Sequence, residues 1–530
     1  MSTQRTPAGL ITAVFLGTFM ALLDMSVVNV ALPAMQTELH ARMTDVQWVV
    51  DGYVLCLSAF MLTGGALGDR FGRRKVFLSG LAVFTLSSVL CALAPDIQTL
   101  IAGRMLQGIG ASAVTPGALS LLAQGFPDQA RRARMIGLWG AVSALAVVLG
   151  PLLGGLLTQG PGWPYIFLIN VPLGLIALVA GAKGIRESAD PEHAATDPLG
   201  QILGVVWLAA LTFVVIEAGH RGWTDPLILG LLAVAVLVFA VFVAVERHSP
   251  RAMLPTSLFA DSRFTVANIA SFVLGFGAYG TFYLLSLYLQ QIQGTSAAMT
   301  GVKFLPYSIA IALCSTQAGR LTARFGPRGT MIGGYGLIGV GLLGLLVLSP
   351  TTGYVTVGVL FAVLGAGMGL AIAPTNAAAL SAVPRQRSGA AASTVNAARQ
   401  AGTALGIAVL GSVLSARATT DMAADIKDAA GAGARDTAAE IVAQHGQAPT
   451  SLRIPADTVH HYFTEAFADG LRLSLLIAGV AILAVTAAVA LFLRPGADPA
   501  AGAPATPEPS PAAERPVAAD NSRPVPRAGD

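Results

Sequence analysis

Four ionisable residues stand within long apolar runs of the sequence. Asp24 lies in LLDMSVVNVALP, Asp51 in WVVDGYVL, Arg104 in LIAGRMLQGIG and Arg399 in NAARQAGTALG. Burial disfavours the charged form of a carboxyl group, whereas a nearby arginine favours it, so an acid between these two influences can take up and release a proton. We therefore predict that Asp24, Asp51 and Arg104 take part in proton coupling.

The two acids differ in their expected depth. Asp24 falls in the outer half of its apolar run, and Asp51 about a turn and a half inside the outer end of the next run, within reach of interfacial water. Ionisable groups are costly inside a membrane and are seldom kept there without a use. We expect the proton role to fall mainly on Asp24. The alternative is that either acid makes a fixed ion pair or a helix-end contact.

The composition indicates the kind of protein that holds these residues. Of 530 residues, 54% are hydrophobic and only 11% are charged, whereas a soluble domain carries roughly 25% charged residues. A chain of this length cannot hide so much apolar surface in a water-soluble core. The composition excludes a soluble enzyme, a disordered protein and a secreted disulfide scaffold. It predicts an all-α integral membrane protein with many spans.

Helices must therefore position the four ionisable residues. A run of about 20 apolar residues crosses a hydrocarbon layer about 30 Å thick, and lipid offers no partner to the polar backbone of any other structure. About 14 runs of this kind are present, at 10–32, 46–68, 76–94, 98–124, 135–158, 163–182, 199–217, 226–245, 264–289, 299–322, 329–349, 353–374, 389–415 and 470–493.

An internal repeat divides these spans into two halves. GALGDRFGRR (Gly65–Arg74) follows the second span, and the similar GRLTARFGPR (Gly319–Arg328) follows the tenth. A spacing of eight spans predicts a six-helix half at 1–185, two inserted helices within 186–262 and a second six-helix half at 263–494. Parallel halves of this kind are typical of transporters that bind substrate between them near the bilayer midplane. The alternative is a chance similarity of two basic glycine loops.

Basic residues predict the orientation. They are concentrated in alternate loops, which the positive-inside rule places in the cytoplasm. We therefore expect a cell inner membrane protein with both termini cytoplasmic and an extracytoplasmic loop at about 416–468. The Pro/Ala-rich stretch 495–530 is predicted to be a disordered cytoplasmic tail.

The sequence offers little support for other energy sources or ligands. None of its four lysines follows a glycine, as the P-loop of a nucleotide-driven pump requires. The three cysteines fall in apolar runs, and the pair His460–His461 lies on a polar stretch. We expect no metal, no cofactor and no nucleic acid partner, and a proton gradient as the energy source.

Several motifs together resemble the major facilitator superfamily, and within it the fourteen-helix drug:proton antiporter family. The likeness covers about residues 8–493 and includes WPYIFLINVP and SLYLQQIQG. The other matching residues are Asp24 and Asn29 in the first span; Gly65, Asp69, Arg70, Gly72, Arg73 and Arg74 in the loop after the second; Arg104, Gln107 and Gly108 in the fourth; and Gly150, Pro151, Gly154 and Gly155 in the fifth.

The resemblance implies roles for these residues. It implies that Arg104 takes part in proton transfer and that the pattern in the fifth span marks exporters. In physical terms, Pro151 bends its helix and the adjacent glycines allow another helix to approach closely. The loop motif is expected to act with them as a conformational switch, in which Asp69 latches the halves together. The alternatives are a loop that only sets topology and ordinary packing of glycine and proline.

The later spans suggest the kind of substrate. They contain no acid in mid-membrane, which favours neutral, amphipathic or singly charged molecules. Aromatic side chains of the ninth span could stack on a flat apolar drug, although packing against lipid or other helices is the alternative. The substrate-pathway candidates are Asn29, Gln107, Phe276, Tyr279, Tyr283 and Arg399.

We therefore predict a monomeric exporter of hydrophobic or amphipathic drugs or antibiotics, driven by protons and working by alternating access. The competing interpretations are uptake or exchange of another small solute on the same fold and, less favoured, a membrane sensor or enzyme. Fold alone does not choose between transport directions.

Overall fold

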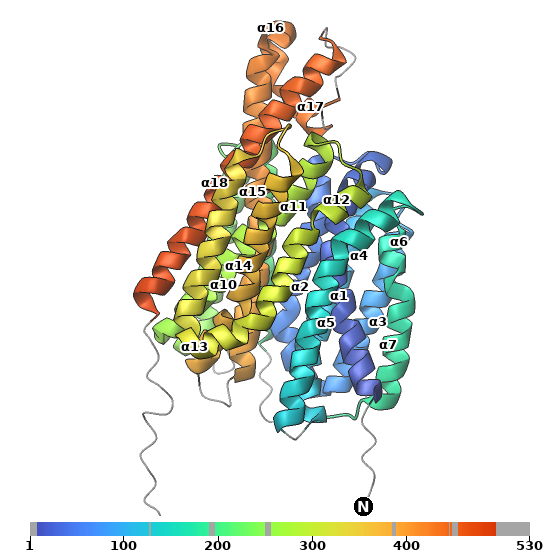
Figure 1. Cartoon of the computed structure of the whole chain (residues 1–530), viewed down its shortest axis with the longest axis vertical. Helices are drawn as coiled ribbons and strands as arrows, with labels where there is room; N and C mark the ends of the chain where they lie inside the picture. Colours follow the sequence, from blue (N-terminus) through green and yellow to red (C-terminus); the bar gives the residue numbers. More distant parts are fainter. Residues whose placement is uncertain are drawn as a thin grey trace, which may run out of the picture. The chain divides into compact units, whose positions relative to one another are not determined.

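The computed structural model describes residues 8–126, 129–189, 197–249, 256–383, 388–444, 446–447 and 454–493. Every regular element in these ranges is a helix, as expected for a chain whose apolar runs must satisfy their own backbone hydrogen bonds (Figure 1). The predicted tail at 495–530 lies outside the described residues.

The N-terminal half consists of five long helices and a broken sixth. The bounds are α1 Ala8–Glu38, α2 Met43–Phe71, α3 Arg73–Ala92, α4 Ile97–Gly125, α5 Gln129–Gln159, α6 Tyr165–Leu168 and α7 Asn170–Gly184. Asp96 begins α4 by accepting a hydrogen bond from the backbone N–H of Thr99 at 2.8 Å. This bond lowers the pKa of the exposed Asp96 carboxyl group.

Two inserted helices follow, α8 Pro198–Arg221 and α9 Pro226–His248. Both begin with an Asp–Pro pair, in which the aspartate caps the helix and proline occupies its first turn. The Asp197 carboxylate accepts from the N–H of Gly200, and the Asp225 carboxylate from that of Leu227, each at 2.8 Å.

The C-terminal half is less regular. Its ninth predicted span is a continuous run of helical turns in which two π-helical stretches interrupt the α-helix. The bounds are η1 Thr256–Ala260, α10 Ser262–Leu274, η2 Gly275–Tyr279, α11 Gly280–Leu287, η3 Tyr288–Ile292, α12 Ala297–Lys303, α13 Leu305–Gly344, η4 Leu345–Val347, α14 Tyr354–Ser381, α15 Ser388–Asp425, α16 Lys427–Ala430, η6 Gly431–Gly433, α17 Ala434–Ala443 and α18 Ala456–Phe492.

Eleven helices in the described part of the chain are long and apolar enough to cross a membrane. One of them, Ala297–Val347, contains two predicted spans and a break at Gly326, whose φ of +72° suits glycine, followed by Pro327. The long helices α2 and α5 are not among the eleven. The predicted number of about 14 spans therefore remains a prediction.

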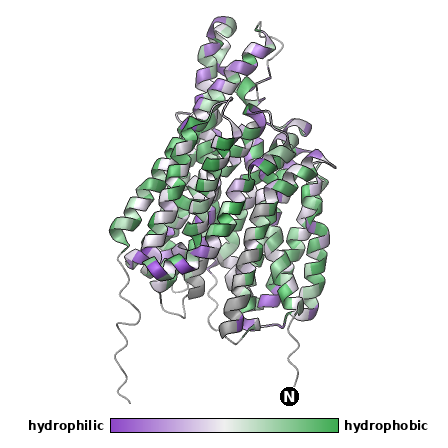
Figure 2. Cartoon of the chain, in the orientation of Figure 1, coloured by the Kyte–Doolittle hydropathy of each residue, from purple (hydrophilic) through white to green (hydrophobic). Residues whose placement is uncertain are grey.

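The segment 416–468, expected as a polar loop, is largely helical. α15 continues to Asp425, α18 already begins at Ala456, and α16 and α17 lie between them. Figure 2 shows that this protruding end carries more hydrophilic residues than the bundle beneath it. A helix satisfies its own backbone in water as well as in lipid, so an alanine-rich helix need not end at the membrane surface.

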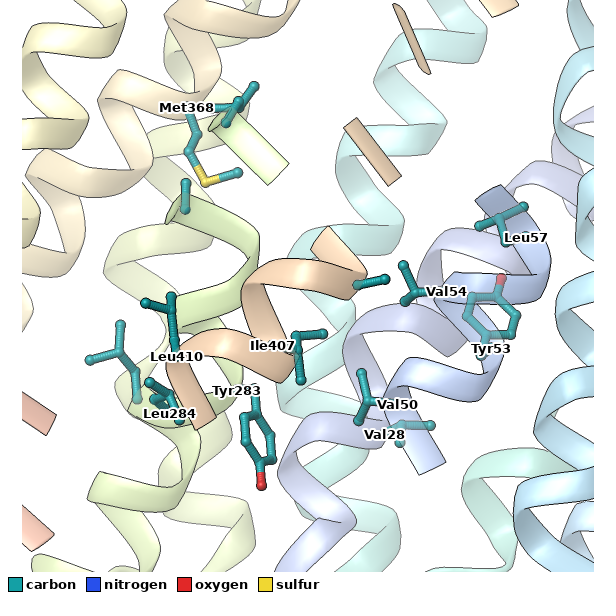
Figure 3. Packing of buried hydrophobic residues seen from close by; sticks show 14 of the residues in the cluster. Val28, Val50, Tyr53, Val54, Leu57, Tyr283, Leu284, Met368, Ile407 and Leu410 are labelled. Carbon is teal, nitrogen blue, oxygen red and sulfur yellow. The ribbon is translucent and has the colours of Figure 1, made fainter. Parts of the chain in front are cut away.

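Buried apolar side chains of both halves form one continuous core. Figure 3 shows part of it, where Val28 and Val50 of the N-terminal half lie near Tyr283 and Ile407 of the C-terminal half. The two halves are therefore in apolar contact at the level of α1, α2, α11 and α15.

Candidate functional site

A buried ion pair joins α1 to α4. The Asp24 side chain is fully buried and that of Arg104 is 1% exposed, and Nη1 of Arg104 donates to Oδ2 of Asp24. The Nε of Arg104 also donates to the backbone carbonyl of Val49 on α2 at 3.0 Å. A buried charge pair is tolerated only where further hydrogen bonds satisfy its remaining atoms.

The side-chain amides of Gln107 and Asn170 and the hydroxyl group of Ser88 form further hydrogen bonds around the ion pair. Oδ1 of Asp24 accepts from Nε2 of Gln107 at 3.3 Å and from Nδ2 of Asn170 at 3.1 Å. Gln107 also accepts from Arg104 at 2.8 Å and donates to Oγ of Ser88 at 2.8 Å. With the bond to Val49 on α2, the network therefore connects α1, α2, α3, α4 and α7, all within the N-terminal half.

Aromatic rings enclose the guanidinium group. The carbon at its centre lies 4.3 Å from the ring centroid of Tyr53 and 5.8 Å from that of Phe167. The Tyr53 hydroxyl donates to the carbonyl of Ala21 at 3.1 Å. A cation over aromatic faces gains electrostatic stabilisation in a dry environment, so the rings favour a charged Arg104.

Asp51 lies apart from this network. Its side chain is fully buried, and neither carboxylate oxygen has a hydrogen-bond partner. The expectation that Asp51 reaches interfacial water is therefore wrong for this arrangement of the helices, because the protein covers its side chain completely. The hydroxyl of Tyr283 on α11 is also buried without a hydrogen bond, and its ring lies near Val50, the neighbour of Asp51 in the sequence (Figure 3).

Hydrogen bonds cross between the halves toward the C-terminal ends of α1 and of the ninth span. Oγ of Ser286 donates to the carbonyl of Asn29 at 2.8 Å, and Nε2 of Gln290 donates to that of Val30 at 3.0 Å. The Asn29 side chain instead bonds its own helix, at the carbonyl of Met25. These bonds hold the first helix of one half against the ninth span of the other.

The glycines of the fifth span lie in two close contacts. A Cβ on Gly150 would overlap the side chain of Ser26, and one on Gly154 would lie 2.6 Å from the carbonyl oxygen of Val27, both on α1. A Cβ on Gly155 would lie 2.6 Å from Cα of Ala298 on α12, which belongs to the other half. The motif therefore holds α5 against its own half and against the opposite one.

Pro151 contributes to the second of these contacts through its backbone. A Cβ on Gly301 of α12 would lie 2.8 Å from the carbonyl carbon of Pro151. Backbone therefore meets backbone where α5 crosses α12, and small residues on both helices permit this approach.

The loop motif is covered by the chain that leaves α7. The Glu187 carboxylate accepts from the backbone N–H of Arg74 at 3.1 Å, and Nη2 of Arg74 donates to the carbonyl of Ala182. The N–H of Arg73 donates to the carbonyl of Ser188 at 2.9 Å. An anion at the start of α3 is favoured by the unpaired N–H groups and the dipole of that helix.

The other residues of this motif have different surroundings. Gly72 has a φ of +111°, and a Cβ there would lie 2.7 Å from the carboxylate carbon of Glu187. Gly65 makes only an ordinary contact, 3.9 Å from Pro116. Arg70 is exposed and lies over the ring of Phe71. The side chain of Asp69 lies outside the described residues, so its latch role remains a prediction.

The substrate-pathway candidates do not form one cluster. Phe276 and Tyr279 are half-buried on η2, and Tyr283 is buried beside Asp51. Arg399 lies on α15, where its Nη2 donates to Oδ1 of Asn396 at 2.6 Å, and no acid in the described part of the chain pairs with it. Gln107 belongs to the Asp24 network.

Sequence reasoning did not find several partners. Asn170 lies within WPYIFLINVP, so a polar residue in an apolar run was an available signal for it. Ser88 and Tyr53 carry no such signal, because serine and tyrosine are common in membrane helices. Glu187 is one acid among several charged residues of its segment. Among the described residues, no group of His, Cys, Asp and Glu side chains could hold a metal ion.

Known proteins resemble this chain in both sequence and fold. The profile of the Major Facilitator Superfamily matches residues 14–407. The methylenomycin A resistance protein of Bacillus subtilis is 37% identical, over 79% of this chain and 90% of that protein. The multidrug resistance protein Stp of Mycobacterium tuberculosis is 35% identical, over 91% of each. The tetracenomycin C resistance and export protein of Streptomyces glaucescens is 34% identical, over 91% and 90%.

A solved structure supports the fold at lower identity. A bacterial homologue of the human lysosomal transporter Spinster, in an inward-facing and unoccupied conformation, superposes with a TM-score of 0.63 at 17% identity. The likeness covers 94% of this chain and all of that one. At this identity the likeness shows a common fold.

Proposed function

The chain belongs to the Major Facilitator Superfamily, and we propose that it exports hydrophobic or amphipathic drugs or antibiotics in exchange for protons. Three relatives that match most of its length are named for drug or antibiotic resistance, and one of them for export. The observation that supports proton exchange concerns Asp51. Its carboxyl group lies where the two halves meet, is fully buried and has no hydrogen-bond partner. An acid in this position is favoured in its neutral, protonated form.

The mechanism that we propose uses the two acids differently. Asp51 takes up a proton from outside, which allows the halves to close around it, and releases the proton when the halves separate toward the cytoplasm. Asp24 and Arg104, with their hydrogen-bond partners, hold five helices of the N-terminal half in one arrangement, and protonation of Asp24 would release Arg104 from its partner. The fifth-span glycines and the loop motif form the contacts that the halves must break and remake.

Arg399 supports a preference among substrates. Its guanidinium group is half-buried in α15 without an acidic partner in the described chain, and arginine stays charged at all physiological pH values. Helices α10 to α15 supply no mid-membrane acid to attract a cation. We therefore propose neutral or singly charged substrates, with acidic groups favoured over doubly cationic ones.

We also propose 14 spans, a monomer, an inner-membrane location and cytoplasmic termini. The break at Gly326 and the length of α2 and α5 support this number of spans. A reporter enzyme fused after residue 440 should be active outside the membrane and one fused near residue 500 inside. The opposite pattern would exclude this topology.

One experiment tests the proposed function directly. The protein is expressed in a drug-sensitive bacterial strain, and growth is measured across a panel of toxic compounds that includes matched acids and esters. We expect protection against several apolar compounds, and loss of that protection when the proton gradient is collapsed. Accumulation of these compounds inside the cells would instead indicate uptake.

A further inference from the structure

The inserted helix α8 lies over the seam where α2 of the N-terminal half meets α15 of the C-terminal half. Two apolar clusters each contain residues of all three helices. One joins Leu55 of α2, Leu208 of α8 and Leu405 of α15, and the other joins Trp48, Ile216 and Ala408 of the same helices. α8 therefore contacts both halves, and α9 packs against it where the ring centroids of Phe239 and Trp207 lie 4.6 Å apart in a tilted arrangement.

Polar bonds attach α8 to α2. Nε2 of Gln201, which is 9% exposed, donates to the carbonyl of Ala59 at 2.7 Å, and the Thr63 hydroxyl donates to Oε1 of the same amide. The nitrogen and the oxygen of the Gln201 amide thus both form hydrogen bonds with α2. Farther along α8, the ring of Phe213 lies 6.2 Å from that of Trp48 on α2.

Glu217, near the C-terminal end of α8, forms an ion pair with Arg221 of the same helix at 3.4 Å. The attachment of α8 to α2 therefore extends from Gln201 near the start of α8 to Phe213 past its middle.

The contact between α8 and α15 is of another kind. Aliphatic side chains make this contact in both clusters, where Leu208 packs with Leu405 and Ile216 with Ala408. Hydrogen bonds are directional and weaken steeply when their atoms shift, whereas apolar burial is non-directional. The hydrogen bonds of Gln201 therefore fix α8 on α2 in one register, whereas the aliphatic contacts with α15 impose no such constraint.

We propose that α8 is a sliding seal, fixed to the N-terminal half by Gln201, that keeps the seam between α2 and α15 closed to lipid while the halves move. The inference rests on the alternating movement of the proposed function. It assigns Gln201 as a positioning residue and gives the inserted pair a role: α8 covers the seam, and α9 holds α8 from the lipid side. α9 suits that place, because only 17% of its apolar window is buried.

The test measures distances between spin labels at one end of the bundle. Cysteines replace Phe71 on α2, Ile202 on α8 and Leu491 on α18, which are 58%, 60% and 75% exposed, two at a time. Cys314 is replaced by alanine, and the buried Cys56 and Cys91 are left in place. Distances are recorded by pulsed electron paramagnetic resonance in acidic and in alkaline buffer, with and without an exported compound.

We expect the Ile202–Phe71 distance to stay constant while the Ile202–Leu491 and Phe71–Leu491 distances change together. A constant Ile202–Leu491 distance with a changing Ile202–Phe71 distance would place α8 on the other half and overturn the proposal. Three distances that never change would overturn it as well, because nothing would then slide. Drug export is measured separately, so a chain that switches but does not export would contradict the proposed function and leave the seal standing.

A variant pair tests the role of Gln201. Gln201→Leu removes both hydrogen bonds to α2 and should broaden the Ile202–Phe71 distance distribution at least twofold. Thr212→Val is the matched control on the same helix, since the Thr212 hydroxyl is buried without a hydrogen bond. It should leave the distribution unchanged. Equal distributions for wild type and Gln201→Leu would show that the amide does not fix α8.

Discussion

Asp24 and Arg104 form an ion pair inside the N-terminal half, with neither side chain more than 1% exposed. Asn170 of α7 and Gln107 of α4 donate hydrogen bonds to Asp24, and Arg104 donates to the carbonyl of Val49 on α2. A pair so enclosed is expensive to break, because either partner alone would be an uncompensated buried charge. The pair therefore acts first as an organiser of the half that contains it, and any proton exchange at Asp24 must overcome this cost.

The first prediction concerns this pair. Asp24→Asn should abolish export and also lower the free energy of unfolding by about 3–5 kcal/mol, because Arg104 loses its counter-charge. Membrane abundance and thermal stability in detergent are measured beside drug export.

The double variant Asp24→Asn/Arg104→Gln is the control for that cost. It removes both charges, so abundance should recover while export stays absent. Wild-type export by Asp24→Asn would show that Asp24 is not a coupling acid. Low abundance of the double variant would show that the pair is not the source of the instability.

The second prediction concerns Asp51. Asp51→Asn should leave abundance unchanged, because the carboxylate accepts no hydrogen bond that the amide would lose. The amide has no exchangeable proton of the required kind, so drug addition should no longer release protons from energised vesicles. Asp45→Asn is the matched control on the same helix, where Asp45 pairs with Arg42 outside the membrane. Drug-evoked proton movement equal to wild type in Asp51→Asn would remove this residue from the mechanism.

The third prediction concerns the loop after α2. Gly72→Ala introduces a side chain at a φ of +111° and against the Glu187 carboxylate, at a cost of order 1–3 kcal/mol. Gly68→Ala is the control, because its Cβ would meet Arg73 only at 3.8 Å. We expect Gly72→Ala to lower membrane abundance and export and Gly68→Ala to lower neither. Glu187→Ala in the Gly72→Ala background should recover part of the loss, and no recovery would assign it to backbone strain alone.

The sequence predicted much of the helical architecture but few of the contacts. Apolar runs located the helices, since lipid permits no other structure, yet they misjudged where helices end. The polar extensions of α15 and α18 beyond the bundle arise from backbone hydrogen bonding, which hydropathy does not measure. Polar residues in apolar runs identified Asp24, Arg104 and Gln107. The hydrogen bonds among these three residues depend on how the helices pack against one another, and the spacing of residues along one helix does not reveal that packing.

Two residues show why the remainder of the site was not found. Asp51 was expected near water because depth was counted along its own helix, whereas its burial depends on the other helices that pack around α2. Gln201 is a single polar residue near the start of an apolar helix and gave no functional signal. Its importance is visible only where α8 meets Ala59 and Thr63. Contacts between distant segments carry the information that local patterns lack.

The last prediction separates the two contacts of the fifth-span glycines. Gly150→Ala places a methyl group on Ser26 within the same half, and Gly155→Ala places one against the backbone of Ala297 and Ala298 in the other half. Overpacking inside a half should destabilise it by about 1–3 kcal/mol in every conformation. Overpacking between halves should destabilise only conformations in which α5 and α12 touch, and so shift the equilibrium toward the outward-open state.

We therefore expect Gly150→Ala to lower abundance and export in proportion, with recovery of both in the double variant Gly150→Ala/Ser26→Gly, because the overlapping atoms are those of the Ser26 side chain. Gly155→Ala should retain abundance but lose export, with faster labelling of a cysteine introduced at Ser286 from outside, because its carbonyl contact at Asn29 opens with the outer ends. Full export by Gly155→Ala would show that α5 and α12 need not approach as closely as the structure places them. Slow labelling together with low abundance would mean that Gly155, like Gly150, serves a contact that does not open during transport.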